Sequence, residues 1–424
     1  MAKIEIHNLG PISNCEMDVS QFTILTGAQA SGKSTIAKAV FFCRTVKDDI
    51  VDAISKRTLL GSENSLFNDV MKILRNKFLQ LFGTSKAMSA DMQLIYYYDD
   101  KTFIKISLRM QEGNDYISPN YVWITFSSNI EKFLRKSFDE GTIKSGEVKN
   151  QVNELFKDDY EAVFIPAGRS LISLLTSQLN YLFTTMDDEQ KRSIDFCTQK
   201  YIERILKIRS LFDNGVTGLI EQKRNTPGAK INTKVIGKML DLVQHVLKGK
   251  YVFKDNEERL YIDEEHYVKI NYTSSGQQET VWIFNILLHI LANNTKAYII
   301  LEEPEAHLYP ESQKSIIEIL AMMGNCNCGI LVTTHSPYVL GALNNLIYAE
   351  ALSTKCEGIE NEIDKTFYIK DHEAYFLENG KIQSCTDADD YNLIINEVID
   401  GASSEINEVY DKLFNMDYEQ RRNA

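Results

Sequence analysis

Residues 22–41 limit most strongly how this chain can fold. FTILTG at 22–27 is apolar, β-branched and ends in glycine, which is typical of a buried strand. Ile36, Val40 and Phe41 then follow at helical spacing. Between these two segments, GAQASGKS at 27–34 matches the pattern G-x-x-x-x-G-K-[ST] in the strand–loop–helix setting that this pattern requires. The sequence therefore predicts an α/β fold in which a helix begins at a phosphate-binding loop.

The residue types in this loop suit a nucleoside triphosphate. Glycines let successive backbone N–H groups curl around phosphate oxygens, and the helix N-terminus adds a favourable dipole. Lys33 would reach the outer phosphates, and the Ser34 hydroxyl would bind Mg²⁺. The alternative is a glycine-rich turn that happens to hold a lysine. Because both flanking elements are correct, we favour the phosphate-binding interpretation.

Two adjacent acids end a second apolar run. KAYIILEE at 296–303 and GILVTTH at 329–335 are apolar segments that end in polar residues, as central parallel strands do. Ligands of open parallel sheets bind beyond the carboxyl ends of the strands. We assign Glu302 to Mg²⁺ and Glu303 to the attacking water. Taken without the phosphate loop, the pair could equally be two solvated acids at a strand end.

Two further features are ambiguous when each is taken alone. Residues 273–278 (TSSGQQ) precede an apolar helical segment, so their serines could bind an anion or simply cap the helix. His335 follows the apolar run and precedes Ser336 and Pro337, which are a good helix start. A lone histidine at a strand end is more often structural than catalytic.

The order and spacing of these motifs resemble the ABC-type ATPase head that SMC, DNA-repair and bacterial-defence ATPases share. The sequence holds the phosphate loop, a signature loop (SSGQQ, similar to LSGGQ), an acidic strand (IILEEPEAHLYP) and a switch histidine (LVTTHSPYVL). The strings EEPEAHLYP and THSPYVL are especially similar to those of the overcoming-lysogenisation-defect (OLD) ATPases and their anti-phage relatives.

This resemblance implies a role for each matching position. Glu303 would be the catalytic carboxylate, and His335 would contact the γ-phosphate. Ser34 and Glu302 would hold Mg²⁺, and residues 305–307 would form a loop that communicates across a dimer. The residues that bind ATP would be Gly27, Ala28, Gln29, Ala30, Ser31, Gly32, Lys33, Ser34 and Thr35 of one protomer, and Ser274, Ser275, Gly276 and Gln277 of the opposite protomer.

Three positions depart from the family pattern or match it only loosely. Glu302 stands where most ABC ATPases have aspartate, which leaves direct and water-mediated coordination of the metal both open. Gln93 is a weak candidate for the lid glutamine that usually follows the first helix. The segment FIPAGRS at 164–170 resembles an element of the defence ATPases, in which Arg169 could face phosphate or lie at the surface beside a helix cap.

One phosphate loop and one signature loop per chain imply a dimer if the signature acts in trans. We expect a head-to-tail homodimer with two ATP molecules between its protomers, or a larger homo-oligomer. The predicted fold is a P-loop NTPase of the ABC-ATPase head type, with a mixed central sheet, an antiparallel β lobe and a helical insertion. The expected parts are the N-terminal ATPase segment (1–169), the helical insertion (170–250), the C-terminal ATPase segment (251–350) and an acidic extension (351–424).

Composition favours a globular protein without membrane spans. Of the 424 residues, 44% are hydrophobic and 25% are charged, which is enough for a packed core. The longest apolar stretch, 281–292, is interrupted by Asn285 and His289, whereas a span needs about 20 apolar residues. Since the N-terminus lacks a secretory leader, we expect a cytoplasmic protein with reduced core cysteines. Cys326 and Cys328 lack the companions of a zinc site.

Charge is distributed unevenly along the chain, whose net charge is −13. Residues 187–250 carry 13 Lys and Arg against 8 Asp and Glu, whereas residues 351–424 carry 7 against 17. The basic insertion could bind nucleic acid or merely keep a helical face soluble. The candidate phosphate contacts are Lys191, Arg192, Lys207, Arg209, Lys223 and Arg224.

The spacing between the motifs limits the classes of ATPase to which this chain can belong. Ser34 and Ser274 are 240 residues apart, which is too far for a transporter subunit, and the chain lacks the long heptad arms of SMC proteins. No nuclease site is recognised in the acidic extension. We therefore expect an ATP-hydrolysing sensor of a multi-protein anti-phage system that controls a separately encoded effector, with a nuclease as the first candidate. The alternative is a RecF-like, DNA-binding repair or recombination ATPase.

Overall fold

The computed structural model describes most of the chain. It covers residues 2–60, 65–112, 117–136, 145–173, 194–225 and 232–395, together with the positions 181, 185–187, 190, 398, 407, 410 and 412–413. The candidate phosphate contacts Lys191 and Arg192 lie outside these residues.

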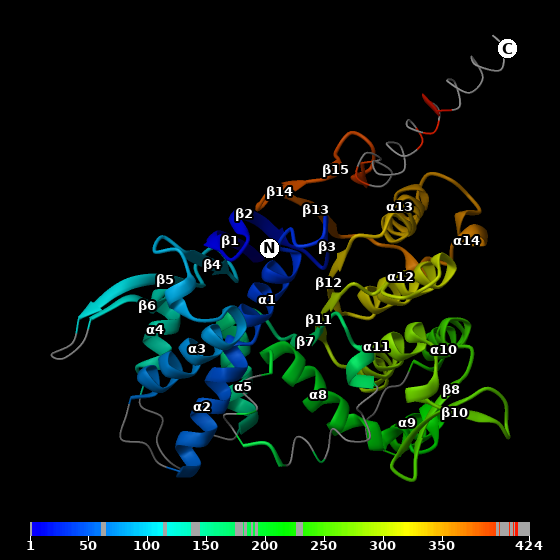
Figure 1. Cartoon of the computed structure of the whole chain (residues 1–424), viewed down its shortest axis with the longest axis horizontal. Helices are drawn as coiled ribbons and strands as arrows, with labels where there is room; N and C mark the ends of the chain where they lie inside the picture. Colours follow the sequence, from blue (N-terminus) through cyan, green and yellow to red (C-terminus); the bar gives the residue numbers. More distant parts are fainter. Residues whose placement is uncertain are drawn as a thin grey trace.

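Eleven strands of the described chain form one mixed sheet, in the order β6-β5-β4-β1-β2-β14-β13-β3-β12-β11-β7. Figure 1 shows this sheet running through the middle of the molecule. The strands are β1 (Ala2–Leu9), β2 (Ile12–Val19), β3 (Phe22–Gly27), β4 (Gln93–Tyr97), β5 (Phe103–Glu112), β6 (Ile117–Phe126), β7 (Glu161–Ile165), β11 (Ala297–Glu302), β12 (Gly329–Thr334), β13 (His372–Glu378) and β14 (Lys381–Ser384).

Five parallel strands make up the half of the sheet that carries the motifs. β3 pairs with β12 and β13, and β11 pairs with β12 and β7, all in parallel. Every residue of β3, β11 and β12 is buried, as their continuous apolar sequences predict. Since β12 separates β3 from β11, the phosphate loop and the two acids emerge from the same edge of the sheet, with one strand between them.

The antiparallel half of the sheet is the predicted β lobe. β1 pairs with β2 and β4, and β5 pairs with β4 and β6, all antiparallel. Buried residues alternate with more exposed ones along β2, which is typical of a sheet with one solvated face. The structure therefore confirms the predicted α/β fold with a mixed central sheet and an antiparallel lobe.

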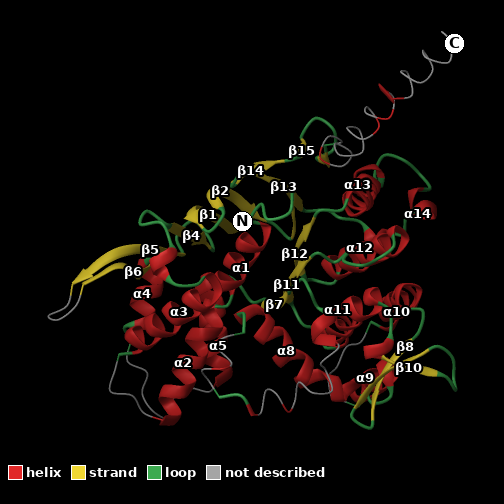
Figure 2. Cartoon of the chain, in the orientation of Figure 1, coloured by secondary structure: helices red, strands yellow, loops and turns green. Residues whose placement is uncertain are grey.

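Helices cover the sheet as two groups, which Figure 2 shows in red. Side chains of β11 point alternately to the two groups. Ile299 and Leu301 pack with the helices α8–α13, whereas Ile300 packs with the helices α1–α5. The helices are α1 (Lys33–Arg44), α2 (Val46–Leu60), α3 (Leu66–Phe82), α4 (Ser128–Leu134), α5 (Ser145–Phe156), α8 (Phe196–Ile208), α9 (Gly215–Arg224), α10 (Thr233–Leu247), α11 (Ser275–Ala292), α12 (Pro310–Asn325), α13 (Pro337–Leu352) and α14 (Ile359–Glu362).

The predicted helical insertion consists of α8, α9 and α10 in the described part of 170–250. A small antiparallel sheet follows it, made of β8 (Lys250–Lys254), β9 (Glu257–Tyr261) and β10 (Tyr267–Lys269). Figure 1 places this sheet next to α9 and α10. No helix among the described residues is both long enough and apolar enough to traverse a bilayer.

Part of the expected acidic extension belongs to the central sheet. β13 lies between β3 and β14, so strands from 372–384 join the ATPase sheet itself. The charge pattern gave no sign of this, because β13 is partly polar and its partner β3 lies far away in the sequence. α14 also lies in this extension.

All seven cysteines are free thiols. Five of them are buried, as predicted, but Cys326 is half-buried and Cys356 is exposed.

Candidate active site

The phosphate loop joins β3 to α1 with a backbone that needs glycine. Gly27 has φ +141°, and a Cβ atom there would lie 2.3 Å from the carbonyl oxygen of Leu377. Gly32 has φ +107°, and Ala30 between them also has positive φ. The loop therefore winds tightly into the first turn of α1, whose N–H groups have no intrahelical partners.

Lys33 lies folded into this loop. Its Nζ donates to the carbonyl oxygens of Gly27 at 2.7 Å and Ala28 at 2.9 Å. Burial lowers the pKa of Lys33, while the nearby carboxylates of Glu303 and Glu305 act in the opposite direction. The structure thus brings the predicted phosphate lysine close to the predicted catalytic acid.

Glu302 ends β11 with its carboxylate buried. Its Oε2 accepts a hydrogen bond from the Ala167 amide at 3.2 Å, whereas its Oε1 is buried with no hydrogen-bond partner among the described residues. Against the effect of burial, Asp195 raises the pKa of Lys38, one turn after Ser34 on α1, and Glu302 acts more weakly in the same direction. A buried carboxylate oxygen without a donor fits the coordination of a cation.

Glu303 stands directly after β11 in a left-handed conformation with φ +43°. Its amide donates to the Thr333 carbonyl oxygen at 2.9 Å and lies 3.3 Å from the Thr333 hydroxyl. This conformation is unfavourable for a residue with a side chain and needs such support. The half-exposed carboxylate lies 3.5 Å from Nδ1 of His335, so the predicted catalytic acid and switch histidine are neighbours.

Glu305 anchors the loop that was expected to communicate across a dimer. It is buried, and its Oε1 accepts from the Thr334 hydroxyl at 2.6 Å and from the His335 amide at 3.0 Å. The side chain therefore ties its loop to the end of β12 and does not itself face outward. His307, further along the loop, has positive φ.

The signature loop caps α11. Ser274 and Gln277 form a reciprocal capping box, in which each side chain accepts from the backbone of the other. Ser274 and Ser275 are exposed. A Cβ atom on Gly276 would lie 2.8 Å from the carbonyl oxygen of His307. In this chain the signature loop thus packs against the loop at 305–307.

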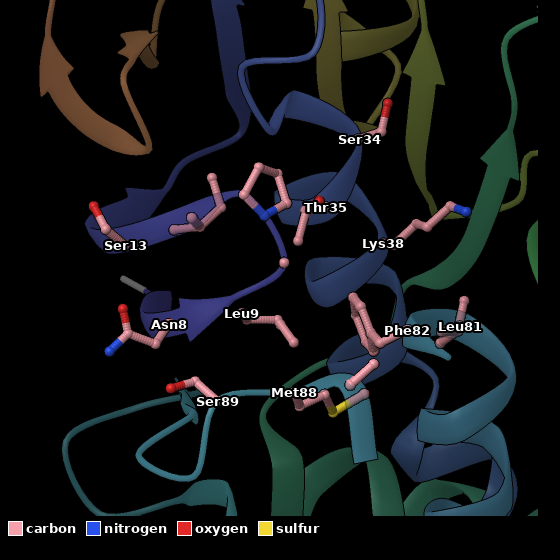
Figure 3. Close-up of a pocket in the computed structure, with 14 residues that line it drawn as sticks. Asn8, Leu9, Ser13, Ser34, Thr35, Lys38, Leu81, Phe82, Met88 and Ser89 are labelled. Atoms are coloured by element: carbon pink, nitrogen blue, oxygen red, sulfur yellow. The ribbon is translucent and has the colours of Figure 1, made fainter. Parts of the chain in front are cut away.

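A cavity of about 600 Å³ opens beside the start of α1. Residues 8–13, in the turn between β1 and β2, form one wall, and residues 81–82 and 87–89 form another. Figure 3 shows Thr35 on the side of α1 that faces this turn, while Ser34 and Lys38 point away from it. The volume is in the range of small-molecule sites. The sequence did not predict this cavity, because residues 8–12 (NLGPI) carry only the pattern of a turn.

Two positions differ from expectation. Arg169 neither faces phosphate nor lies at the surface: its side chain is fully buried and donates to carbonyl oxygens, among them that of Glu302 at 2.7 Å. Gln93, the weak candidate for the lid glutamine, pairs with His7 at the start of β4 in the antiparallel lobe and does not line the cavity.

The basic insertion is partly used inside the molecule. Arg209, a candidate phosphate contact, is buried, with its guanidinium 5.0 Å from the centre of the Phe253 ring, and so cannot grip nucleic acid. Arg204 pairs with Glu161, and Lys238 pairs with Asp364. Lys207 and Arg224 are exposed, and Lys223 is half-buried.

Residues 1–340 match the model of a family described as an AAA ATPase domain. The chain belongs to this family. The match spans all the motifs, from the phosphate loop through Glu303 to His335. The protein is therefore an ATPase, as predicted. No curated protein is similar enough in sequence to count as a relative.

Solved SMC head domains are similar over most of their length but share little sequence. An SMC head bound to the C-winged helix domain of ScpA is 13% identical and covers 90% of this chain and 96% of its own, with a TM-score of 0.44. An SMC head bound to the C-terminal domain of ScpA, derived from Pyrococcus furiosus, is 12% identical over 91% and 96%, with a TM-score of 0.40. The SMC head of Thermotoga maritima is 10% identical over 90% and 97%, with a TM-score of 0.36.

Proposed function

We propose that this ATPase hydrolyses magnesium-bound ATP with Glu303 as the catalytic carboxylate and His335 as the γ-phosphate contact. The observation that carries this assignment is the gathering of Glu303, His335 and Lys33 beyond the carboxyl ends of β11, β12 and β3. At such a position a carboxylate can orient and deprotonate water, while cations stabilise the phosphate charge.

Ser34 and Glu302 are the proposed magnesium ligands. The Oε1 of Glu302, which has no hydrogen-bond partner among the described residues, supports this role. Since the described chain holds no group of three His, Cys, Asp or Glu side chains that could bind a metal ion, other ligands would have to complete the coordination. Mg²⁺ is commonly bound by one or two protein oxygens together with substrate phosphates and waters. When bound, the ion would neutralise charge on the phosphates.

Residues 27–35 are the proposed phosphate cradle, in which Lys33 would leave the loop carbonyls and turn to phosphate oxygens. The neighbouring cavity would then receive the rest of the nucleotide, because Ser34 and Thr35, at the start of α1, are among the residues that line it. The Glu303 carboxylate would take a proton from the attacking water, and His335 would hold the terminal phosphate.

We further propose that two protomers close head to tail, with residues 274–277 of each one against the nucleotide of the other. Exposed aromatic side chains stand beside three of the site's loops: Tyr272 is 76% exposed, Tyr309 72% and Tyr338 59%. Large exposed aromatics are typical of surfaces that another protein covers. Their position supports a dimer that buries the signature and switch loops together.

The proposed biological role is that of a sensor in an anti-phage system, in which ATP hydrolysis controls a separately encoded effector, with a nuclease as the first candidate. The support is the resemblance of EEPEAHLYP and THSPYVL to strings of the OLD-type defence ATPases. The alternative, a repair ATPase that grips DNA with the basic insertion, is weakened by the burial of Arg209.

The test is the Glu303→Gln variant, measured with the purified full-length chain and with the protein encoded beside its gene. We expect ATP turnover to fall at least about 100-fold while ATP binding is kept, because only the base is lost. The matched control is Glu360→Gln, which removes an exposed carboxylate on α14. Unchanged turnover would refute the catalytic role. Reduced turnover with unchanged control of the effector would refute the sensor role alone.

A further inference from the structure

Arg169 holds the ends of several elements together from inside the protein. It follows β7 by four residues, and its side chain is fully buried. Its Nη1 donates to the carbonyl oxygens of Pro166 at 2.5 Å and Glu302 at 2.7 Å, and its Nη2 donates to that of Glu303 at 2.9 Å. The guanidinium therefore fixes the backbone at the end of the strand that carries both acids.

Glu279 provides the counter-charge from the signature helix. It is the fifth residue of α11, and its carboxylate is buried 3.1 Å from Nε of Arg169. The same carboxylate accepts from the amides of Arg169 at 3.1 Å and Ser170 at 2.9 Å. A buried charge pair persists only when its remaining donors and acceptors are satisfied, and here nearly all of them are.

Residues 166–173, which we name the strap, contact two parts of the proposed site. At one end the Ala167 amide donates to the Glu302 carboxylate at 3.2 Å. At the other end the Ser173 hydroxyl donates to the Gln278 carbonyl oxygen at 2.6 Å, one turn into α11. The strap thus links the acids of β11 to the helix that begins with the signature loop.

Glu303 depends on this linkage because its backbone is strained. Its φ of +43° is kept by Thr333 on its amide side and by Arg169 on its carbonyl side. If one of these holds is lost, the residue can relax toward an ordinary conformation and move its carboxylate. A displacement of about 1 Å at a catalytic group can cost about 100-fold in rate.

We propose that Arg169 and Glu279 form a positioning pair that sets the Glu303 carboxylate according to the placement of α11. A signature helix drawn toward the nucleotide of a partner would pull Glu279, and Arg169 would pass the movement to the Glu302–Glu303 peptides. The pair does not touch the substrate. The inference rests on the proposed catalytic role of Glu303 and adds the route by which dimer closure controls hydrolysis.

The first experiment measures turnover and ATP affinity of Arg169→Lys and Glu279→Gln in the full-length protein. Lysine keeps the charge but loses the planar fork that reaches three carbonyl groups at once. We expect kcat to fall about 100-fold in Arg169→Lys while the Kd for ATP changes less than about 3-fold. Glu279→Gln should shift kcat in the same direction.

Arg44→Lys is the matched control. Arg44 is also a buried arginine, paired with Asp158 at 3.0 Å, but it lies at the far end of α1 from Lys33, roughly 16 Å away at the usual helical rise. It should lower the melting temperature without a comparable loss of kcat. If Arg44→Lys and Arg169→Lys lose turnover equally, or if Arg169→Lys loses ATP binding as well, the role of Arg169 is merely structural.

The deciding experiment combines Arg169→Lys with Glu303→Gln. Because Arg169 acts through Glu303, the double variant should lose less than about 2-fold beyond Glu303→Gln alone. If the fold-losses of turnover in the two single variants multiply in the double variant, the positioning role is wrong, while the catalytic role of Glu303 stands. Full turnover of Glu303→Gln alone would instead overturn the proposed function, and the positioning role with it.

Discussion

Gly27 shows how much of the site depends on single residues. A methyl group there would meet the Leu377 carbonyl oxygen at 2.3 Å, at a φ of +141° that other residues rarely adopt. We expect Gly27→Ala to lower the free energy of unfolding by about 2–3 kcal/mol, measured by urea titration, because backbone must move to relieve the clash. Gly341→Ala on α13 should be neutral or stabilising, because an added Cβ there would meet no atom of the described residues within 4 Å other than those of its own helix. Equal effects of the two substitutions would contradict this.

Local sequence patterns located some site residues and missed others for a physical reason. Lys33, Glu303 and His335 stand within short strand-end motifs, so their neighbours in sequence predict their position. Arg169 was left undecided because its burial depends on Glu279, 110 residues later in the chain. The anchoring role of Glu305 likewise depends on β12, which a strand-end pattern does not reveal.

At the scale of elements, α11 carries near its end a histidine, His289, that lies close to positively charged side chains. Burial and the nearby Arg204 and Lys223 lower the pKa of His289 to about 4. The folded protein therefore keeps this histidine neutral, whereas the unfolded chain takes up a proton below about pH 6.5. The free energy of unfolding should therefore decrease as the pH falls from about 6.5 toward about 4, the pKa of His289 in the folded protein. Asp48, whose pKa burial raises to about 6, acts in the opposite direction.

The His289→Gln variant separates these two effects. We expect its melting temperature to fall less than that of the wild type between about pH 7.5 and about pH 5, because Asp48 titrates equally in both proteins. Differential scanning calorimetry at the two pH values gives the comparison. An identical drop in both proteins would mean that His289 is not the acid-sensitive group.

Elements were predictable where their periodicity was strong. The continuous apolar runs predicted β3, β11 and β12, which the structure confirms, and the predicted antiparallel lobe contains β4, β5 and β6. α4 and α5 were not predicted, and neither was the insertion of β13 beside β3. Pairing between strands more than 300 residues apart is fixed by tertiary packing, which a single sequence window does not show.

At the scale of the whole molecule, we propose that the signature contact is made with a second copy of the chain. α1 packs on β3, β7, β11 and β12, whereas α11 packs on α8, α9 and α10. The exposed Ser274 and Ser275 are therefore free to meet another protomer, beside the exposed Tyr272 and Tyr309. A slowly hydrolysing variant should accumulate the closed, nucleotide-bound pair.

The most direct test is the molecular mass of Glu303→Gln in solution, measured by light scattering with Mg²⁺ and with or without ATP. We predict that ATP doubles the mass of the smallest species, and that Ser275→Arg prevents this because a bulky cation would block the signature contact. A mass that ATP leaves unchanged, in a protein whose wild-type form turns ATP over at full rate, would contradict the account.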